Sequence, residues 1–134
     1  MSHFNAELYV DVEFEAAHSL PFVGPKHKCF NVHGHSYKVR LYAYGAVDEQ
    51  HDSETQGMVI DYDAILTCWH ERFHRQLDHR LLNDIKALHN PTAENLCRFI
   101  LKGMPEYVTA VRVREAPYAG CLVRREDIGF VVSQ

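Results

Sequence analysis

The stretch from Cys29 to Tyr37 reads Cys-Phe-Asn-Val-His-Gly-His-Ser-Tyr, and the rest of the chain is organised around it. Its two histidines, His33 and His35, are separated by one residue, and side chains two residues apart point to the same face of a β-strand. Such imidazoles lie roughly 7 Å apart at Cβ, so both can reach one metal ion through bonds of about 2.0–2.1 Å. A single His-x-His also occurs by chance as two half-exposed strand residues. A metal site therefore needs a third ligand.

The third ligand comes from the run Leu8-Tyr-Val-Asp-Val-Glu-Phe-Glu-Ala-Ala-His18, in which apolar and polar residues alternate. This period of two predicts a half-buried strand over about Leu8 to Ala17, with His18 on its apolar face. A second strand is predicted over about His33 to Gly45. If the two strands pair antiparallel, the end of the first lies beside the start of the second. His18 then converges with the His-x-His pair, which gives the ligand set of a catalytic zinc with one open position.

Cys29 follows a loop that Pro21, Gly24 and Pro25 predict over Leu20 to Lys28. Because this loop leads directly to the histidine pair, Cys29 can enter the same pocket as a ligand, a nucleophile or a base. The four cysteines, at positions 29, 68, 97 and 121, show no paired spacing typical of zinc ribbons or redox motifs. Those at 68 and 97 fall in predicted helices and are expected to act as small buried hydrophobic residues.

Two helices are predicted in the middle of the chain. Asp61 caps the first, which spans about Tyr62 to Leu77 and carries apolar residues at helical spacing. It ends in Asp78 and His79, and an acid beside a histidine is also typical of an ordinary polar helix end. Thr92 caps the second helix, and Pro105 stops it.

The last part of the chain returns to strand patterns. A third strand is predicted over about Val108 to Glu115, with Val111 and Val113 on the same face as Glu115. A carboxylate at the end of an apolar strand face is uncommon unless it is paired, so Glu115 is a candidate site residue. Residues 121–125 and 129–132 supply the last strand material. The order ββααββ favours an α+β fold with an antiparallel sheet.

Composition limits the function classes. At 134 residues, with 46% hydrophobic and 24% charged residues, the chain has ordinary globular values and is predicted to form one domain over residues 1–134. Its net charge of −4 gives no basic footprint, so a nucleic-acid partner is not expected. No apolar run approaches the roughly 20 residues of a membrane span, and the start of the chain lacks the apolar core of a signal peptide. We therefore expect a cytoplasmic protein with reduced thiols and no membrane partner.

Taken together, these motifs resemble the 6-pyruvoyl-tetrahydropterin synthase and 6-carboxy-tetrahydropterin synthase superfamily over nearly the whole chain. The matching blocks are, in order, Phe14-Glu-Ala-Ala-His18, Lys28-Cys29, His33-Gly-His35-Ser-Tyr37, Gly57-Met-Val-Ile-Asp61, Leu77-Asp-His79, Pro91-Thr-Ala-Glu-Asn95 and Glu115. The details that resemble the 6-carboxy branch are the three-residue gap between Cys29 and His33, the segment Leu81-Leu82-Asn83-Asp84, and Ala119-Gly-Cys121. The chain departs from the family pattern in a long excursion from Asp48 to Gln56 and in the Ala-Pro that follows Glu115.

The resemblance implies a tunnelling fold: a four-stranded antiparallel sheet with two helices packed on one face. Trimers of such chains would close a β-barrel and stack in pairs as a homohexamer, with active sites at subunit boundaries. The implied Zn²⁺ ligands are His18, His33 and His35. The implied catalytic residues are Cys29 as the base, Asp78 and His79 as a proton relay, and Glu115 as the anchor of the pterin, with Thr92 and Glu94 as further substrate-binding candidates.

The implied activity is that of a zinc-dependent lyase in queuosine (7-deazapurine) biosynthesis. It converts 7,8-dihydroneopterin triphosphate to 6-carboxy-5,6,7,8-tetrahydropterin and releases triphosphate and acetaldehyde. One alternative is a 6-pyruvoyl-tetrahydropterin synthase, which eliminates triphosphate without cleaving a carbon–carbon bond. Another is a zinc- and pterin-binding module without turnover, against which the combination of Cys29, Asp78 and His79 argues, because binding alone needs neither a base nor a relay.

Overall fold

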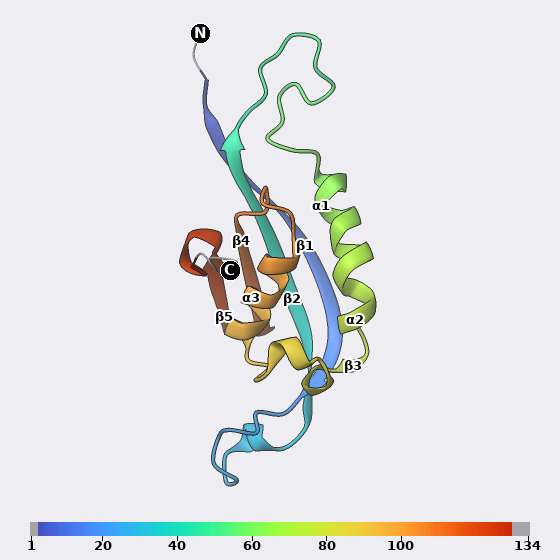
Figure 1. Cartoon of the computed structure of the whole chain (residues 1–134), viewed down its shortest axis with the longest axis vertical. Coiled ribbons are helices and arrows are strands. Elements are labelled where there is room, and N and C mark those ends of the chain that lie inside the picture. The colour runs from blue at the N-terminus through green and yellow to red at the C-terminus, as the bar shows by residue number, and fades with distance from the viewer. Residues whose placement is uncertain (1–2, 130–134) are drawn as a thin grey trace, which may run out of the picture.

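The computed structural model of the chain describes residues 3–129 and contains a five-stranded sheet with helices packed on one face (Figure 1). The strands are β1 (Asn5–His18), β2 (His33–Ala46), β3 (Arg80–Leu81), β4 (Ala110–Ala116) and β5 (Ala119–Arg124), in the spatial order β3-β1-β2-β4-β5. The α-helices are α1 (Tyr62–Trp69), α2 (Arg75–Leu77) and α3 (Ala93–Gly103). Short 3₁₀ turns lie at Lys28–Phe30, Leu82–Asp84, Lys86–Leu88 and Arg125–Asp127. The α+β fold class is confirmed.

The two long strands at the centre of the sheet pair antiparallel along their full lengths. Their register runs from Asn5 opposite Ala46 to His18 opposite His33. Along β1 the alternation is strict near the site, because Phe14 and His18 are buried on the face that the helices cover. The structure therefore extends the predicted first strand by three residues at its start and by one at its end.

The sheet has a fifth strand that the sequence analysis did not predict. It is β3, which runs parallel to β1 and pairs Ala16 with Arg80 and Ala17 with Leu81. A strand of two residues is too short to show a period of two, so this segment was expected to be only the end of a helix. Among the other four strands every pairing is antiparallel, as predicted.

The predicted first helix is one helical run with a π-helical turn at its centre, His70–His74, between α1 and α2. Its buried residues, Ile65, Trp69, Phe73 and Leu77, are spaced four apart. In a regular α-helix, side chains four residues apart differ in direction by about 40°, so this row of buried residues would gradually turn away from the sheet. One wider turn corrects that drift and keeps Phe73 and Leu77 facing the sheet. Asp61 caps the run as predicted, because its side chain accepts a hydrogen bond from the backbone N–H of Asp63 at 2.9 Å.

The predicted cap of the second helix is also confirmed, since Thr92 Oγ1 accepts a hydrogen bond from the backbone N–H of Asn95 at 3.1 Å. None of the helices within residues 3–129 is long and apolar enough to cross a membrane. The strand material predicted over residues 129–132 lies outside the described residues, apart from Gly129, which is not in a strand.

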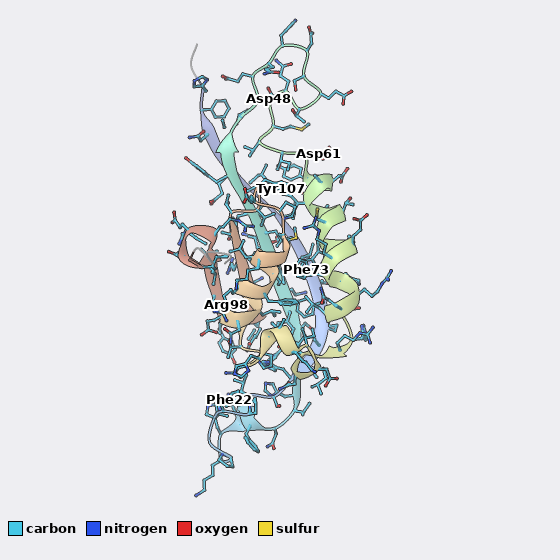
Figure 2. All side chains as sticks on the ribbon, viewed as in Figure 1. Phe22, Asp48, Asp61, Phe73, Arg98 and Tyr107 are labelled. Atoms are coloured by element: carbon cyan, nitrogen blue, oxygen red, sulfur yellow. The ribbon has the colours of Figure 1, made fainter. Side chains whose placement is uncertain are left out.

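Two loops project from opposite ends of the sheet, one carrying Phe22 and the other Asp48 (Figure 2). The loop of Asp48 is the long excursion noted in the sequence. The Asp48 carboxylate organises it by accepting hydrogen bonds from the Gln50 backbone N–H at 2.9 Å and the Thr55 hydroxyl at 2.6 Å. The loop of Phe22 joins β1 to β2, so it leaves the sheet at His18 and returns at His33. The candidate site therefore lies at the end of the molecule that carries Phe22.

Candidate metal centre and active site

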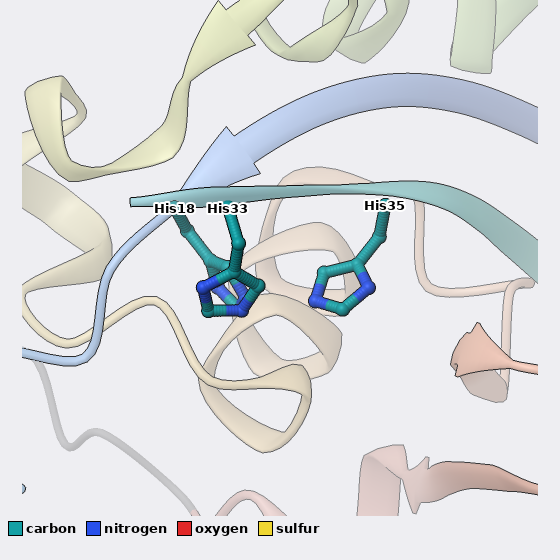
Figure 3. A group of neighbouring side chains, drawn as sticks. All are labelled: His18, His33 and His35. Carbon is teal, nitrogen blue, oxygen red and sulfur yellow. The ribbon is translucent and has the colours of Figure 1, made fainter. Parts of the chain in front are cut away.

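His18, His33 and His35 converge on the helix-covered face of the sheet (Figure 3). His18 lies directly opposite His33 in the β1–β2 ladder, and His35 is the next residue of β2 on the same face. The ring centroids are 4.6 Å apart for His18 and His33, 5.0 Å for His18 and His35, and 4.9 Å for His33 and His35. This convergence is the one that the strand alternation predicted.

The nitrogen atoms of these three rings fit a metal ion. One ligand atom from each ring lies within 4.8 Å of the others. Ligands of a tetrahedral zinc with bonds of about 2.0–2.1 Å lie about 3.3–3.4 Å apart, so small side-chain rotations close the set. His18 is only 1% exposed, and its Nε2 is buried with no hydrogen-bond partner among residues 3–129. A buried bare nitrogen is unfavourable unless something binds it, and a metal ion meets that need.

Backbone carbonyls fix which nitrogen is free in two of the three rings, those of His18 and His33. His18 Nδ1 donates to the carbonyl oxygen of Pro91 at 2.7 Å, and His33 Nδ1 donates to that of Asn31 at 2.8 Å. A carbonyl can only accept, so each Nδ1 carries the proton and each Nε2 presents a lone pair. Burial lowers the pKa of His18, although the hydrogen bond to Pro91 opposes the shift. Burial, the larger effect, therefore favours a neutral His18 ring, and the Pro91 carbonyl fixes the tautomer in which Nε2 is available for a metal.

Cys29 lies on the loop that joins His18 to His33. The backbone N–H of Leu20 donates to the carbonyl of Cys29 at 2.8 Å, which closes the loop. The loop is also anchored where it leaves β1, because Asn83 accepts from the Ser19 N–H at 2.8 Å and donates to the Ser19 carbonyl at 3.0 Å. Cys29 is half-buried, at the same end of the sheet as the histidines. The anchoring role of Asn83 was not predicted from the sequence, where this residue appeared only within a block that resembles the 6-carboxy branch.

Glu115 projects beside the histidine cluster, with Oε2 at 3.7 Å from His35 Nε2. The register between β4 and β5 shifts between Arg114 and Ala116, which leaves Glu115 as the extra residue of a β-bulge. Bulges redirect the side chain that they carry and are frequent next to active sites. Of the Ala-Pro that follows Glu115, Ala116 is the last residue of β4 and pairs with Ala119, and Pro117 lies in the tight hairpin turn.

The start of α3 adjoins the same centre through Pro91, whose carbonyl binds His18. Thr92 is half-buried and its hydroxyl is engaged as the helix cap. Glu94 lies exposed in the first turn of the helix. The structure therefore places both candidate substrate-binding residues on the segment that follows Pro91.

Asp78 and His79 form a hydrogen-bonded pair at the outer edge of β1. His79 Nδ1 donates to Asp78 Oδ2 at 2.8 Å, and the backbone N–H of Glu15 donates to Asp78 Oδ1 at 2.9 Å. The bond from Glu15 and then that from His79 hold the pKa of Asp78 below its usual value. His79 has a φ of 58°, a left-handed conformation uncommon outside glycine, and its side chain is 79% exposed.

This pair lies apart from the histidine cluster. His79 lines a surface hollow over the ends of β1 and β2, whose lining includes Glu15 and Ser36 as well as His35. The side chains of Glu15 and Ser36 alternate with those of His18 and His35 along the two strands, so they point to the opposite face of the sheet. Within one chain, the structure brings together the three histidines and Glu115, and it places the Asp78–His79 pair apart from them, at the edge of β1 beside Glu15.

The fold and the site define an α+β protein with a three-histidine centre suited to a metal ion. Residues 7–126 match the family of 6-pyruvoyl tetrahydropterin synthase, and the chain belongs to this family. The family resemblance predicted from the sequence motifs is thereby confirmed.

Among curated relatives, the 6-carboxy-5,6,7,8-tetrahydropterin synthase of Synechocystis sp. is 35% identical over 99 residues, which cover 74% of each chain. The enzyme of the same name from Bacillus subtilis is 28% identical and covers 95% of this chain and 90% of its own. The structure of the Caenorhabditis elegans 6-pyruvoyl tetrahydropterin synthase superposes with a TM-score of 0.75 at 24% identity, over 92% of this chain and 99% of that one. The family and these relatives confirm the expected class of enzyme, a lyase of the pterin synthase type.

Proposed function

We propose that this chain is a zinc-dependent 6-carboxy-5,6,7,8-tetrahydropterin synthase that acts on 7,8-dihydroneopterin triphosphate in queuosine biosynthesis in the cytoplasm. The observation that carries the proposal is the three-histidine cluster with Glu115 at 3.7 Å from His35. A metal centre and a carboxylate anchor thus adjoin each other on one face of the sheet. The relatives that bear the name of this activity support the 6-carboxy reaction in particular.

The proposed metal is Zn²⁺, held by His18, His33 and His35. An all-imidazole set with one position left for substrate is typical of catalytic zinc. When bound, the ion supplies a Lewis acid that stabilises the negative charge formed as the substrate side chain loses a proton. The carbonyls of Pro91 and Asn31 would keep the rings in the tautomer that this role requires.

Each remaining site residue has a proposed role. Cys29 takes the proton from the substrate side chain as a thiolate, a form that a neighbouring cation favours. His79, oriented by Asp78, moves a second proton. Glu115 accepts hydrogen bonds from the amino-pyrimidine edge of the pterin, with Thr92 and Glu94 bordering it.

The placement of His79 supports a site built from more than one chain. Its side chain lies apart from the histidine cluster, beside Glu15 at the edge of β1, so a relay from His79 to a pterin at the metal requires a second copy. We propose the homohexamer of two stacked trimers that the family resemblance implies. Among the described residues, β1 over positions 5–14 has a strand on only one side, and β5 forms the opposite edge of the sheet. Joining these edges would close a barrel without leaving a free edge.

Charge supports the same closure. On the open face β1 carries Asp11 and Glu13, whereas β4 carries Arg112 and Arg114. Arg40 of β2 binds Asp11 with two hydrogen bonds, at 2.7 and 2.9 Å. Arg112 and Arg114 lie one strand inside the β5 edge, so a barrel that joins β5 to β1 of the next chain brings them towards its Asp11 and Glu13 across a single intervening strand.

The test is product analysis after incubation of the zinc-loaded protein with 7,8-dihydroneopterin triphosphate. Mass spectrometry should detect 6-carboxy-tetrahydropterin, and a hydrazine trap should capture an equal amount of acetaldehyde. A 6-pyruvoyl product without acetaldehyde would identify the alternative synthase. Retained zinc and pterin binding without any product would identify a binding module.

The matched control in this experiment is Cys29→Ala. It should retain zinc and pterin binding yet lose turnover by about 10²–10⁴-fold, the usual contribution of a positioned acid–base group. Loss of zinc from this variant would instead make Cys29 a metal ligand.

A further inference from the structure

Two thiols meet away from the metal centre. Cys97 lies on α3 and Cys121 on β5, and their sulfur atoms are 3.3 Å apart. Cys121 pairs with Val113 in the β4–β5 ladder, and α3 packs on both of these strands. The contact therefore joins a helix to the outer strand of the sheet.

The two thiols have unequal surroundings. Cys97 is fully buried, whereas Cys121 is half-buried. The hydrogen bond from Cys97 to the sulfur of Cys121 lowers the pKa of Cys121, against the opposing effects of burial and of the nearby Glu94 and Glu115 carboxylates. The same bond, together with burial, raises the pKa of Cys97. Cys121 is thus the member that ionises first, and Cys97 is the protonated donor that supports it.

We propose that Cys97 and Cys121 form a redox-active dithiol, which a small-molecule disulfide such as oxidised glutathione converts to an internal disulfide. The sulfur atoms need to approach from 3.3 Å to a bond length of about 2.05 Å. This inference rests on the contact between α3 and β5 and is independent of the pterin chemistry proposed above.

The conversion takes two exchange steps. In the first, Cys121 loses its proton and its sulfur attacks one sulfur of the oxidant; the S–S bond of the oxidant breaks, and the released thiolate takes up that proton. In the second, Cys97 loses its proton and attacks the Cys121 sulfur of the mixed disulfide; the second small thiolate leaves with that proton. The protein loses two hydrogen atoms, and the oxidant is reduced to two thiols.

The mixed disulfide itself prepares the second step. The hydrogen bond to Cys121 is the main reason for the raised pKa of Cys97. Once Cys121 is part of a disulfide, its sulfur no longer carries the charge that holds the Cys97 proton. Cys97 then becomes easier to ionise while it is already in contact with the sulfur that it must attack.

The other two cysteines provide an internal comparison. Cys68 contacts the hydroxyl of Tyr107 at 3.4 Å, and Cys29 lies on the loop between β1 and β2. Neither has another thiol within hydrogen-bonding distance among the described residues. The same oxidant can therefore form mixed disulfides at these two positions but no internal link.

The experiment treats the folded full chain with oxidised glutathione, blocks the remaining thiols with N-ethylmaleimide and digests the product with trypsin under non-reducing conditions. Cleavage after lysine and arginine places Cys97 in the peptide of residues 87–98 and Cys121 in that of residues 115–124, each with a single cysteine. We expect these two peptides to appear linked to each other, two hydrogen atoms lighter than their sum, and to separate after reduction. A Cys121 peptide that carries only glutathione, or only the blocking reagent, would overturn the proposal.

Three variants sharpen this result. Cys97→Ser should stop the reaction at a stable glutathione adduct on Cys121, and Cys121→Ser should leave Cys97 unreacted because it is buried. The matched control, Cys68→Ser, should form the linked peptides to the same extent as the unmodified chain. If Cys97→Ser instead formed no adduct on Cys121 while retaining its native circular dichroism, Cys121 would not be the attacking thiol and the proposal would fail.

Discussion

At the scale of single residues, His18 and His33 each direct one ring nitrogen at a backbone carbonyl and leave the other for a metal ion. We predict that His33→Ala loses stoichiometric zinc, because two imidazoles cannot replace three. Removing a group that hydrogen-bonds to a metal ligand typically lowers metal affinity by about 10–100-fold. Removing the ligand itself, as in His33→Ala, should lower the zinc affinity by more than that. Metal analysis after dialysis measures this. His51→Ala, in the loop at the opposite end of the molecule, is the control and should keep its zinc. Full occupancy in His33→Ala would remove His33 from the site.

Glu115 is held by its bulge with its carboxylate beside His35. If it anchors the pterin, Glu115→Gln loses a charge-assisted hydrogen bond, which typically contributes about 1.5–3 kcal/mol. The pterin dissociation constant should then rise by roughly ten- to a hundredfold, measured by fluorescence titration. Glu126→Gln, an exposed carboxylate on the 3₁₀ turn after β5, should leave the constant unchanged. Equal affinities for both variants would exclude the anchoring role.

The geometry of Asp78 predicts a pH-dependent stability difference. Its native pKa is lowered by the Glu15 N–H and by His79, so it stabilises the fold above its unfolded pKa of about 3.9 and loses that contribution as the pH falls through the lower native value. The melting temperature of Asp78→Asn should therefore be lower than that of the unmodified protein at about pH 6, and this difference should become smaller towards about pH 3. Thermal melts followed by circular dichroism at both pH values measure the difference. Asp84→Asn, an exposed carboxylate without a hydrogen bond among the described residues, should show a smaller difference at both.

The sequence predicted the three metal-binding candidates but not the atoms that orient them. The histidines were found because strands alternate with a period of two, and that period survives folding in a sheet with one buried face. The carbonyls of Pro91 and Asn31 could not be found in this way, because every residue has a carbonyl and only tertiary structure directs one at a ring. Glu115 was found from its place on an apolar face, whereas the bulge that aims it depends on the register of two strands.

At the scale of elements, the end of α3 is held by one side chain. Arg125 Nη2 donates to the carbonyls of Leu101 and Pro105 at 3.0 Å, and Nε donates to that of Val108 at 2.9 Å. The last carbonyls of a helix have no partner within the helix, so Arg125 satisfies groups that are otherwise left open. This contact ties the C-terminal end of α3 to the turn that follows β5.

We predict that Arg125→Met destabilises the protein by about 2–3 kcal/mol, because several partly buried carbonyls lose a charged donor. Equilibrium unfolding in urea measures the change as a lower midpoint with an unchanged slope. The neighbouring Arg124→Met is the matched control, since Arg124 is exposed and should tolerate the same change within about 0.5 kcal/mol. Equal midpoints for the two variants would show that Arg125 does not hold the helix end.

The elements that the sequence analysis missed are those with weak periodic signals. Helices and long strands were predicted because their periods repeat several times, and their bounds differ from the structure by at most three residues. The strand β3 has only two residues, and the π-helical turn at His70–His74 is a local correction within an otherwise regular stripe. Both depend on packing against β1, which a local pattern does not encode.

At the scale of the whole molecule, one chain carries the histidine cluster on one face of its sheet and the Asp78–His79 pair apart from that cluster, at the edge of β1. If this pair acts as the proposed relay on a substrate held at the histidines, it must come from a neighbouring copy. Cys29, by contrast, lies on the loop that leaves the sheet at His18 and returns at His33, and so is grouped with the histidine cluster of its own chain. This division predicts the outcome of mixing two inactive proteins.

We predict that Cys29→Ala and His79→Ala restore activity to each other when they are dissociated in mild denaturant, mixed in equal amounts and reassembled. In the mixture, an active site between two adjacent chains is complete when one chain is His79→Ala, which supplies Cys29 and the metal, and its neighbour is Cys29→Ala, which supplies His79. Random assembly forms such a site in about one case in four, so product formation should recover to about a quarter of the unmodified rate. Each variant reassembled alone is the control and should stay inactive. If the mixture stayed inactive although native mass spectrometry showed mixed oligomers, Cys29 and His79 would have to act from the same chain, and the proposed boundary site would be wrong.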